Sequence, residues 1–238
     1  MSRLRVRYSG KSHVGLRRKV NEDSFIMLPE HQIFVVSDGM GGHEAGDLAS
    51  SMVIDSIARL DPGMDPAQKM HAVREALQQS NAAIYAESQR RGATIGATVV
   101  VLVLSDGHWL SLWVGDSRIY RLRNGEITML TSDHSVVGEL VSSGQMSWDE
   151  AEHHPQSNQI TRAVGVSDVL EIDKAHGELL SGDRYLLCSD GLSKYATFAD
   201  LGRLMRGAPI ETLSETLVQL ALDGGGADNV SVIIVDVI

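Results

Sequence analysis

The first third of the chain changes from a strand-like to a helix-like spacing of its apolar residues. Residues 3–9 alternate apolar and basic side chains, which predicts a strand with one solvated face. Residues 24–28 and 33–36 are short apolar runs that predict two further strands. From residue 44 the spacing becomes helical. The apolar face of this helix is made of Leu48, Met52, Val53, Ile57 and Leu60.

A second predicted helix carries clear start and stop signals. Asp65 is a helix N-cap, Pro66 suits the first helical position, and Gln68 completes a capping box. Gly92 follows the basic pair Arg90-Arg91, a combination typical of a helix C-terminus.

Between residues 94 and 130 the pattern predicts a β-meander. Its strands are residues 94–104, 108–114, 118–123 and 126–130. They are separated by the turn sequences Asp106-Gly107, Gly115-Asp116-Ser117 and Asn124-Gly125, the last typical of a type I′ turn. The unbroken apolar run from 99 to 104 indicates that this strand is buried on both faces.

A stretch of weaker periodicity follows, and we expect it to be a flap at about residues 132–168. Two short helices are predicted within it, at 135–143 and 147–152, the second with a Ser147…Glu150 capping box. We expect this flap to be an insertion within one domain rather than a second domain.

The C-terminal part predicts strands near 170–178 and 184–189, a helix at 209–222 and a last strand at 230–237. This order of elements predicts an α+β fold in which helices lie outside two antiparallel sheets.

Composition narrows the class of protein. The 238 residues are 43% hydrophobic and 22% charged, which suits one globular domain over residues 1–238. The net charge of −10 argues against nucleic acid as the main partner. The single cysteine fits a reducing compartment, and neither a signal peptide nor a membrane-spanning run is evident. We therefore expect a cytoplasmic protein and a monomer.

Acidic residues at expected strand ends and tight turns are the main candidates for chemistry. They are Glu22, Asp23, Asp38, Asp116, Asp190 and Asp228. The apolar runs before Asp38 and Asp190 both end in Ser-Asp-Gly, which suggests that two distant strands deliver carboxylates to one place. An isolated Asp-Gly pair is usually just a turn. A shared cluster of such oxygen donors would suit a hard cation, Mg²⁺ or Mn²⁺.

Six ordered motifs resemble the metal-dependent Ser/Thr protein phosphatases, the PPM or type 2C family. They are Arg18-Lys-Val-Asn21-Glu22-Asp23, Val36-Ser-Asp38-Gly39-Met40-Gly41-Gly42, Gly96-Ala-Thr98, Gly115-Asp116-Ser117-Arg118, Ser189-Asp190-Gly191-Leu192 and Asp228-Asn229-Val230-Ser231. The flap sequence is similar to that of the bacterial members. The resemblance covers nearly the whole chain, from about residue 10 to 236.

The resemblance implies a four-layer α-β-β-α sandwich with a metal centre at one end. Asp38 would bridge two Mn²⁺ or Mg²⁺ ions, and the Gly39 carbonyl would bind one of them. Asp190 and Asp228 would hold the other ion. Asp116 with Asp190 would form a third, weaker site.

The remaining roles implied by the resemblance concern water and phosphate. Glu22 and Asp23 would act directly or through bound waters, and Arg18 would bind the substrate phosphate. Two metal ions lower the pKa of a bridging water, so that hydroxide can attack the phosphorus of a phosphoserine or phosphothreonine. The expected partners are phosphoproteins and a cognate bacterial Ser/Thr kinase.

The chain departs from the family pattern at a few positions. Met40 stands where many eukaryotic members have a histidine proposed as general acid, so the leaving-group proton is expected from water. His43 and His134 are the other candidates for that role, although a lone histidine is more often structural. Lys194-Tyr195 replaces more usual acidic or aromatic residues and could alter contacts near the site.

One non-catalytic function and two other classes of phosphatase are the alternatives to this interpretation. A non-catalytic pseudophosphatase that binds a phosphoprotein or kinase is the alternative, although such a protein has no need of every carboxylate. A cysteine phosphatase would need a phosphate-binding loop after Cys188, which we expect to be a buried strand residue. An aspartyl-nucleophile phosphatase would need an Asp-x-Asp-x-Thr motif, which neither Asp38 nor Asp190 provides.

Overall fold

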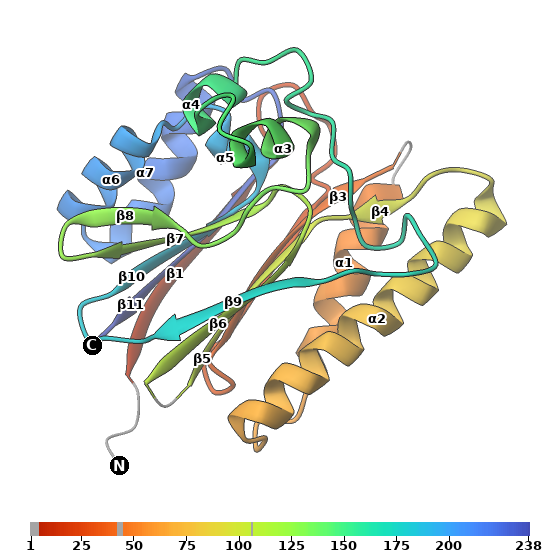
Figure 1. Cartoon of the computed structure of the whole chain (residues 1–238), viewed down its shortest axis with the longest axis horizontal. Coiled ribbons are helices and arrows are strands. Elements are labelled where there is room, and N and C mark those ends of the chain that lie inside the picture. The colour runs from red at the N-terminus through yellow and green to blue at the C-terminus, as the bar shows by residue number, and fades with distance from the viewer. Residues whose placement is uncertain (1–4, 42–44, 106) are drawn as a thin grey trace.

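Two antiparallel β-sheets pack face to face in the computed structural model, and helices cover the outer face of each sheet (Figure 1). The structure describes residues 5–41, 45–105 and 107–238. The five-stranded sheet contains, in spatial order, β1 (Val6–His13), β11 (Val230–Val237), β10 (Arg184–Cys188), β7 (Arg118–Arg123) and β8 (Glu126–Met129).

The second sheet is six-stranded and lies on the other side of the central core. In spatial order its main path is β2 (Asp23–Leu28), β3 (Ile33–Met40), β5 (Val99–Ser105), β6 (His108–Val114) and β9 (Asp173–Glu178). The short β4 (Gly96–Ala97) pairs with the end of β3, where Gly39 lies opposite Ala97.

Helices form the two outer layers. The second sheet is covered by α1 (Ala45–Ala58) and α2 (Pro66–Arg91), and the first sheet by α6 (Phe198–Gly207) and α7 (Ile210–Asp223). Shorter helices are α3 (Val136–Ser142) and α4 (Trp148–Ala151) in the flap and α5 (Asp190–Ser193) after β10. The α+β four-layer sandwich expected from the sequence is confirmed.

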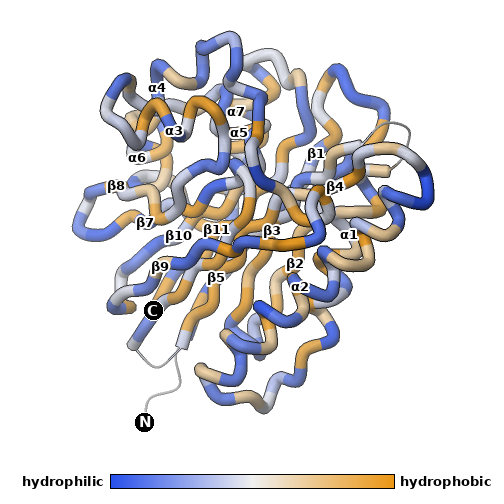
Figure 2. The backbone as a smooth tube through the Cα atoms, turned by 45° about the vertical axis from the view of Figure 1, so that its right-hand side comes forward, coloured by the Kyte–Doolittle hydropathy of each residue, from blue (hydrophilic) through white to orange (hydrophobic). Residues whose placement is uncertain are grey.

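Side-chain alternation divides the apolar residues of the strands among three cores. On β3, Ile33 and Val35 belong to the core beneath α1 and α2, whereas Phe34 and Val36 belong to the core between the sheets. The same alternation along β5 explains why its sequence is apolar without a break. Figure 2 shows these apolar residues following the strands of both sheets.

Local signals placed the ends of α2 correctly. The Asp65 carboxylate accepts the Gln68 backbone N–H, and the Gln68 side chain accepts the Asp65 N–H, so both halves of the capping box form. Gly92 ends the helix with a left-handed φ of 63°.

The predicted β-meander is wrong in one respect, because it is split between the sheets. The hairpin β5–β6 belongs to the second sheet and the hairpin β7–β8 to the first. The chain crosses at residues 115–117, where Gly115 has a φ of 102° and packs against Thr98. A Cβ on Gly115 would lie 2.6 Å from the Thr98 side chain, so only glycine fits this crossing.

Two strand boundaries also differ from the prediction. The strand expected at 94–104 is interrupted at Thr98, which separates β4 from β5. The strand expected at 33–36 continues to Met40, so Asp38 and Gly39 lie within β3. The predicted turn at Asn124-Gly125 is confirmed, with φ values of 52° and 83°.

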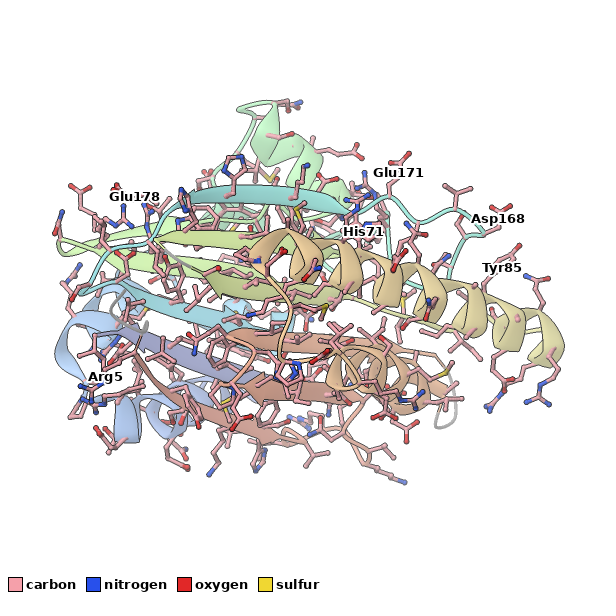
Figure 3. The ribbon with its side chains drawn as sticks, turned by 90° about the horizontal axis from the view of Figure 1, so that it is seen from below. Arg5, His71, Tyr85, Asp168, Glu171 and Glu178 are labelled. Atoms are coloured by element: carbon pink, nitrogen blue, oxygen red, sulfur yellow. The ribbon has the colours of Figure 1, made fainter. Side chains whose placement is uncertain are left out.

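The end of the flap is attached to α2. Asn81 accepts the Gly165 backbone N–H at 2.7 Å and donates to the Ser167 carbonyl at 2.9 Å. Figure 3 shows this segment, labelled at Asp168, beside the helix that carries Tyr85. Within the described residues, we find no helix whose length and apolar character would carry it across a bilayer.

Candidate metal centre

A cleft of about 470 Å³ opens at one end of the sandwich, where segments from both sheets meet. Its lining residues come from the β1–β2 loop, β3, the β6–β7 crossing, the flap, α5 and the loop before β11. They are Arg18, Glu22, Asp38, Gly39, Met40, Gly41, Thr98, Asp116, Asn158, Ile160, Asp190, Lys194 and Asp228.

Burial and neighbouring negative charges raise the pKa of Asp38 and of Asp116 in the cleft. Burial is the largest cause for Asp38, and the negative charges of Asp23, Asp190, Asp116 and Asp228 also raise its pKa well above the usual range. Burial and then Asp190 likewise raise the pKa of Asp116. Carboxylates that destabilise one another's charged form in this way are stabilised by a shared cation.

Asp23 lies behind the cleft and does not line it. It pairs with Asp38 in the β2–β3 register, and its Oδ2 accepts a hydrogen bond of 2.8 Å from the Ser189 hydroxyl. Burial, the largest cause, raises the pKa of Asp23 to about 7, and the charges of Asp190 and Asp228 contribute to the rise. Its position suits an indirect role, in which Asp23 orients Asp38 or a water molecule.

Two cationic side chains contact the acidic residues on the other side of the cleft. Lys194 Nζ lies 2.6 Å from Asp190 Oδ2 and 3.7 Å from Asp228 Oδ2. Arg18 Nη2 lies 2.9 Å from Asp228 Oδ2, and the Arg18 side chain is 49% exposed at the mouth of the cleft. Arg18 can therefore meet both solvent and a bound anion.

The loop that carries Arg18 is held in place by Asn229. The Asn229 amide donates to the carbonyls of Val14 and Val20 at 2.9 and 3.0 Å, and its oxygen accepts the Glu22 N–H at 2.8 Å. These bonds join the β1–β2 loop to the residues that follow Asp228.

Close backbone packing positions Glu22 and Gly39. The Glu22 carboxylate accepts the Gly46 N–H at 3.2 Å, and burial raises its pKa. A Cβ on Gly39 would lie 2.0 Å from the Gly46 carbonyl oxygen. At this point β3 and α1 therefore approach each other so closely that only glycine fits. The Gly39 backbone consequently faces the cleft without a side chain in the way.

The side chains present fit a hard divalent ion by their chemistry. The donors are carboxylate oxygens, which Mg²⁺ and Mn²⁺ prefer. Buried oxygens of two of them, Asp190 Oδ1 and Asp23 Oδ1, have no hydrogen-bond partner among the described residues. In the part of the chain that the structure describes, no three Asp, Glu, His or Cys side chains are already close enough to hold one ion, so ion binding would require these side chains to move.

Of the predicted site residues, the structure brings Arg18, Glu22, Asp38, Gly39, Asp116, Asp190 and Asp228 together in the cleft. His134 lies elsewhere: its Nδ1 accepts the Gly115 N–H at 3.0 Å and its ring stacks on Trp113. His43 lies outside the described residues. Cys188 is buried in the core beneath α6 and α7, as predicted.

Sequence reasoning did not assign cleft positions to Thr98, Asn158 and Ile160. Thr98 fixes the backbone of Asp38, since its hydroxyl accepts the Asp38 N–H at 3.1 Å and its own N–H donates to the Asp38 carbonyl at 2.8 Å. The signal for Thr98 was its place in the Gly96-Ala-Thr98 motif. Asn158 and Ile160 lie in the aperiodic flap, where spacing gives no information about direction.

Comparison with known proteins agrees with this geometry. The family model described as protein phosphatase 2C matches residues 9–222. The Ser/Thr protein phosphatase PstP of Mycobacterium tuberculosis is 39% identical over 240 residues, which cover 99% of this chain and 46% of that protein. The chain thus spans about half the length of this curated relative.

Solved structures match the fold over its whole length. PppA, described as a key regulatory component of the T6SS in Pseudomonas aeruginosa, is 39% identical with a TM-score of 0.91, and 98% of each chain is covered. The catalytic domain of a PstP, solved in complex with two manganese ions, is 34% identical with a TM-score of 0.89, and 99% of each chain is covered. The chain therefore belongs to the protein phosphatase 2C family, the metal-dependent Ser/Thr protein phosphatases, in its bacterial form.

Proposed function

We propose that this chain hydrolyses phosphoserine and phosphothreonine in proteins, with two Mn²⁺ or Mg²⁺ ions held by the acidic residues of the cleft. The observation that carries the proposal is the convergence of Asp38, Asp116, Asp190 and Asp228, from four separate segments, on one cleft with Arg18 at its mouth. The manganese ions bound by the related PstP domain support the choice of metal.

Each acidic residue has a proposed place around the ions. Asp38, near the floor of the cleft, would bridge them, and the Gly39 carbonyl would bind one ion. Asp190 and Asp228 would hold the other ion. Asp116 is close enough to Asp190 for the charge of Asp190 to raise its pKa, and it would share with Asp190 a third, weaker site.

The remaining acidic residues, Glu22 and Asp23, would act on bound water. Glu22 lines the cleft, whereas Asp23 would act from behind Asp38. When bound, the two ions supply a water of lowered pKa that can act as hydroxide near neutral pH.

Arg18 would bind the phosphate. Its planar guanidinium donates parallel hydrogen bonds that match two phosphate oxygens, and its charge offsets the negative charge of the transferred group. The exposed position of Arg18 lets a phosphorylated side chain of another protein reach it without entering the core.

Neither Met40 nor His134 is suited to protonate the leaving group. Met40 carries no transferable proton, and His134 is buried and bonded to Gly115. We propose that water supplies this proton. We also propose that residues 1–238 form one catalytic domain, which acts in the cytoplasm as a monomer on phosphoproteins made by a Ser/Thr kinase.

Phosphate release from a phosphothreonine peptide tests the function. Turnover should rise with added Mn²⁺, stop with EDTA, and fall by about three orders of magnitude or more in Asp190→Asn, which loses a metal ligand. Asp168→Asn, an exposed change outside the cleft, is the matched control and should keep wild-type turnover. Folded protein that shows no turnover at any Mn²⁺ or Mg²⁺ concentration would instead support the non-catalytic alternative, binding of a phosphoprotein or kinase.

A further inference from the structure

Lys194 reaches into the acidic cleft from the end of α5. One helical turn separates it from Asp190, and this i,i+4 spacing brings its ammonium to 2.6 Å from Asp190 Oδ2. The same nitrogen lies 3.7 Å from Asp228 Oδ2. Lys194 therefore lies near two carboxylates, one shortly after β10 and one shortly before the neighbouring strand β11.

The ammonium is charged and largely removed from solvent. The Lys194 side chain is only 20% exposed. Burial, the largest single effect, would lower its pKa, but the charges of Asp190, Asp228 and Asp116 together outweigh burial and raise it. A buried ammonium of this kind depends on its carboxylate partners.

The oxygens that bind Lys194 are the ones that the proposed function gives to a metal ion. The Lys194 ammonium lies 2.6 Å from Asp190 Oδ2, so a divalent ion bound to the same oxygen would have to occupy nearly the same position. Asp190 Oδ1 has no partner among the described residues, so it could still take up an ion while Lys194 keeps Oδ2. For the ion to be coordinated by both Asp190 and Asp228, the ammonium would have to move away.

We propose that Lys194 is a built-in competitor of the metal ion at Asp190 and Asp228. It neutralises these carboxylates when the metal concentration is low, and so keeps the acidic site folded. It also weakens metal binding, because the ion must displace it. Lys194 then sets the metal concentration at which the site fills. This inference rests on the proposed function, since it needs the carboxylates to bind metal.

Calorimetric titration of Mn²⁺ into EDTA-treated and dialysed protein tests the competition. Lys194→Gln should bind Mn²⁺ at least tenfold more tightly than wild type, and Lys194→Met, which keeps the apolar stem, should do the same. Lys194→Arg keeps the charge and should stay within about threefold of wild type. Lys174→Gln, the same change at an exposed position on β9 outside the cleft, should have no effect.

Thermal unfolding separates competition from a merely structural role. Without metal, Lys194→Gln should melt several degrees below wild type, because its carboxylates repel one another with no internal cation. With saturating Mn²⁺ the two proteins should melt at nearly the same temperature. Lys194→Gln could instead melt below wild type by the same amount with and without Mn²⁺, and bind Mn²⁺ with unchanged affinity. That result would assign Lys194 a purely structural role and overturn the proposal.

The other outcomes are also decisive. Equal or weaker Mn²⁺ binding by folded Lys194→Gln and Lys194→Met overturns the inference while leaving the proposed phosphatase function standing. Wild-type protein that binds no Mn²⁺ at all overturns both, since the carboxylates would then not form a metal site.

Discussion

The Arg118 guanidinium binds the Asp133 carboxylate through three hydrogen bonds of 2.7 to 3.1 Å. Their side chains are only 6% and 3% exposed. Arg118 also lies 2.7 Å from Glu152 and 4.6 Å from the centre of the Trp148 ring. One arginine of β7, two residues after Asp116, thus joins the start of the flap and α4 to the first sheet.

Replacing Arg118 should destabilise the protein strongly. Arg118→Met leaves the buried Asp133 carboxylate without its partner, and we expect a loss of about 3–5 kcal/mol in the free energy of unfolding by urea. The double variant with Asp133→Asn should lose much less than the sum of the two single variants. Arg91→Met, which breaks an exposed pair on α2, should change stability far less. Equal small effects for both arginines would contradict this account.

Replacing Arg18 should weaken substrate binding more than turnover. Arg18→Ala removes the charged donor that we propose binds the phosphate, and we expect KM to rise about tenfold to hundredfold in the phosphothreonine assay. Arg18→Lys should recover part of this loss because the charge remains while the planar fork is gone. Arg17→Ala, at the exposed neighbouring position, is the control. A KM equal to that of wild type in Arg18→Ala would refute its role in binding phosphate.

Adding a methyl group at Gly39 should disturb the metal centre through the backbone. The new Cβ would lie 2.0 Å from the Gly46 carbonyl oxygen, so β3 and α1 must move apart. We expect Gly39→Ala to lose about 1–3 kcal/mol of stability and to bind Mn²⁺ more weakly, measured by urea unfolding and calorimetry. Gly207→Ala at the end of α6, where a Cβ meets nothing within 4 Å, should be close to neutral. Wild-type Mn²⁺ affinity in Gly39→Ala would argue against any role for this backbone segment.

His134 should make the stability of the protein depend on pH. Burial, and then the charge of Arg162, lower its pKa below the usual 6.5. Protonation of Nδ1 would also break its hydrogen bond from the Gly115 N–H. Below pH 6.5, His134 is therefore protonated more readily in the unfolded chain than in the folded chain. The free energy of unfolding consequently falls as the pH drops.

The comparison of wild type with His134→Asn isolates this effect. The difference in unfolding free energy between them, measured in EDTA, should shrink between pH 7.5 and pH 5.5, because only wild type carries the imidazole. A difference that stays constant over this range would show that His134 does not titrate as argued.

Local chemistry in the sequence predicted much of the fold and the site. The capping box of Asp65 and the turn at Asn124-Gly125 depend on neighbouring residues, so their signals are complete in a few positions. The Ser-Asp-Gly ends of two apolar runs likewise indicated Asp38 and Asp190, because a carboxylate beside a glycine at the end of a buried run is unusual outside a turn or a site.

What the sequence could not predict depends on tertiary packing. Hairpin signals are the same whether consecutive hairpins share a sheet or not, so the crossing at Gly115 was missed. The position of Asp23 behind Asp38 follows from pairing across strands. The contact of Lys194 with Asp228 joins two loops that spacing cannot relate.

The attachment of the Arg18 loop has a consequence for how the protein becomes active during synthesis. Asn229, which holds this loop through Val14, lies 215 residues after it in the chain. Among the described strands, β1 likewise pairs with β11 alone. The chain must therefore be synthesised through residue 229 before the loop that carries Arg18 is held in place, and a nascent chain that ends before Asn229 should lack the proposed phosphate site.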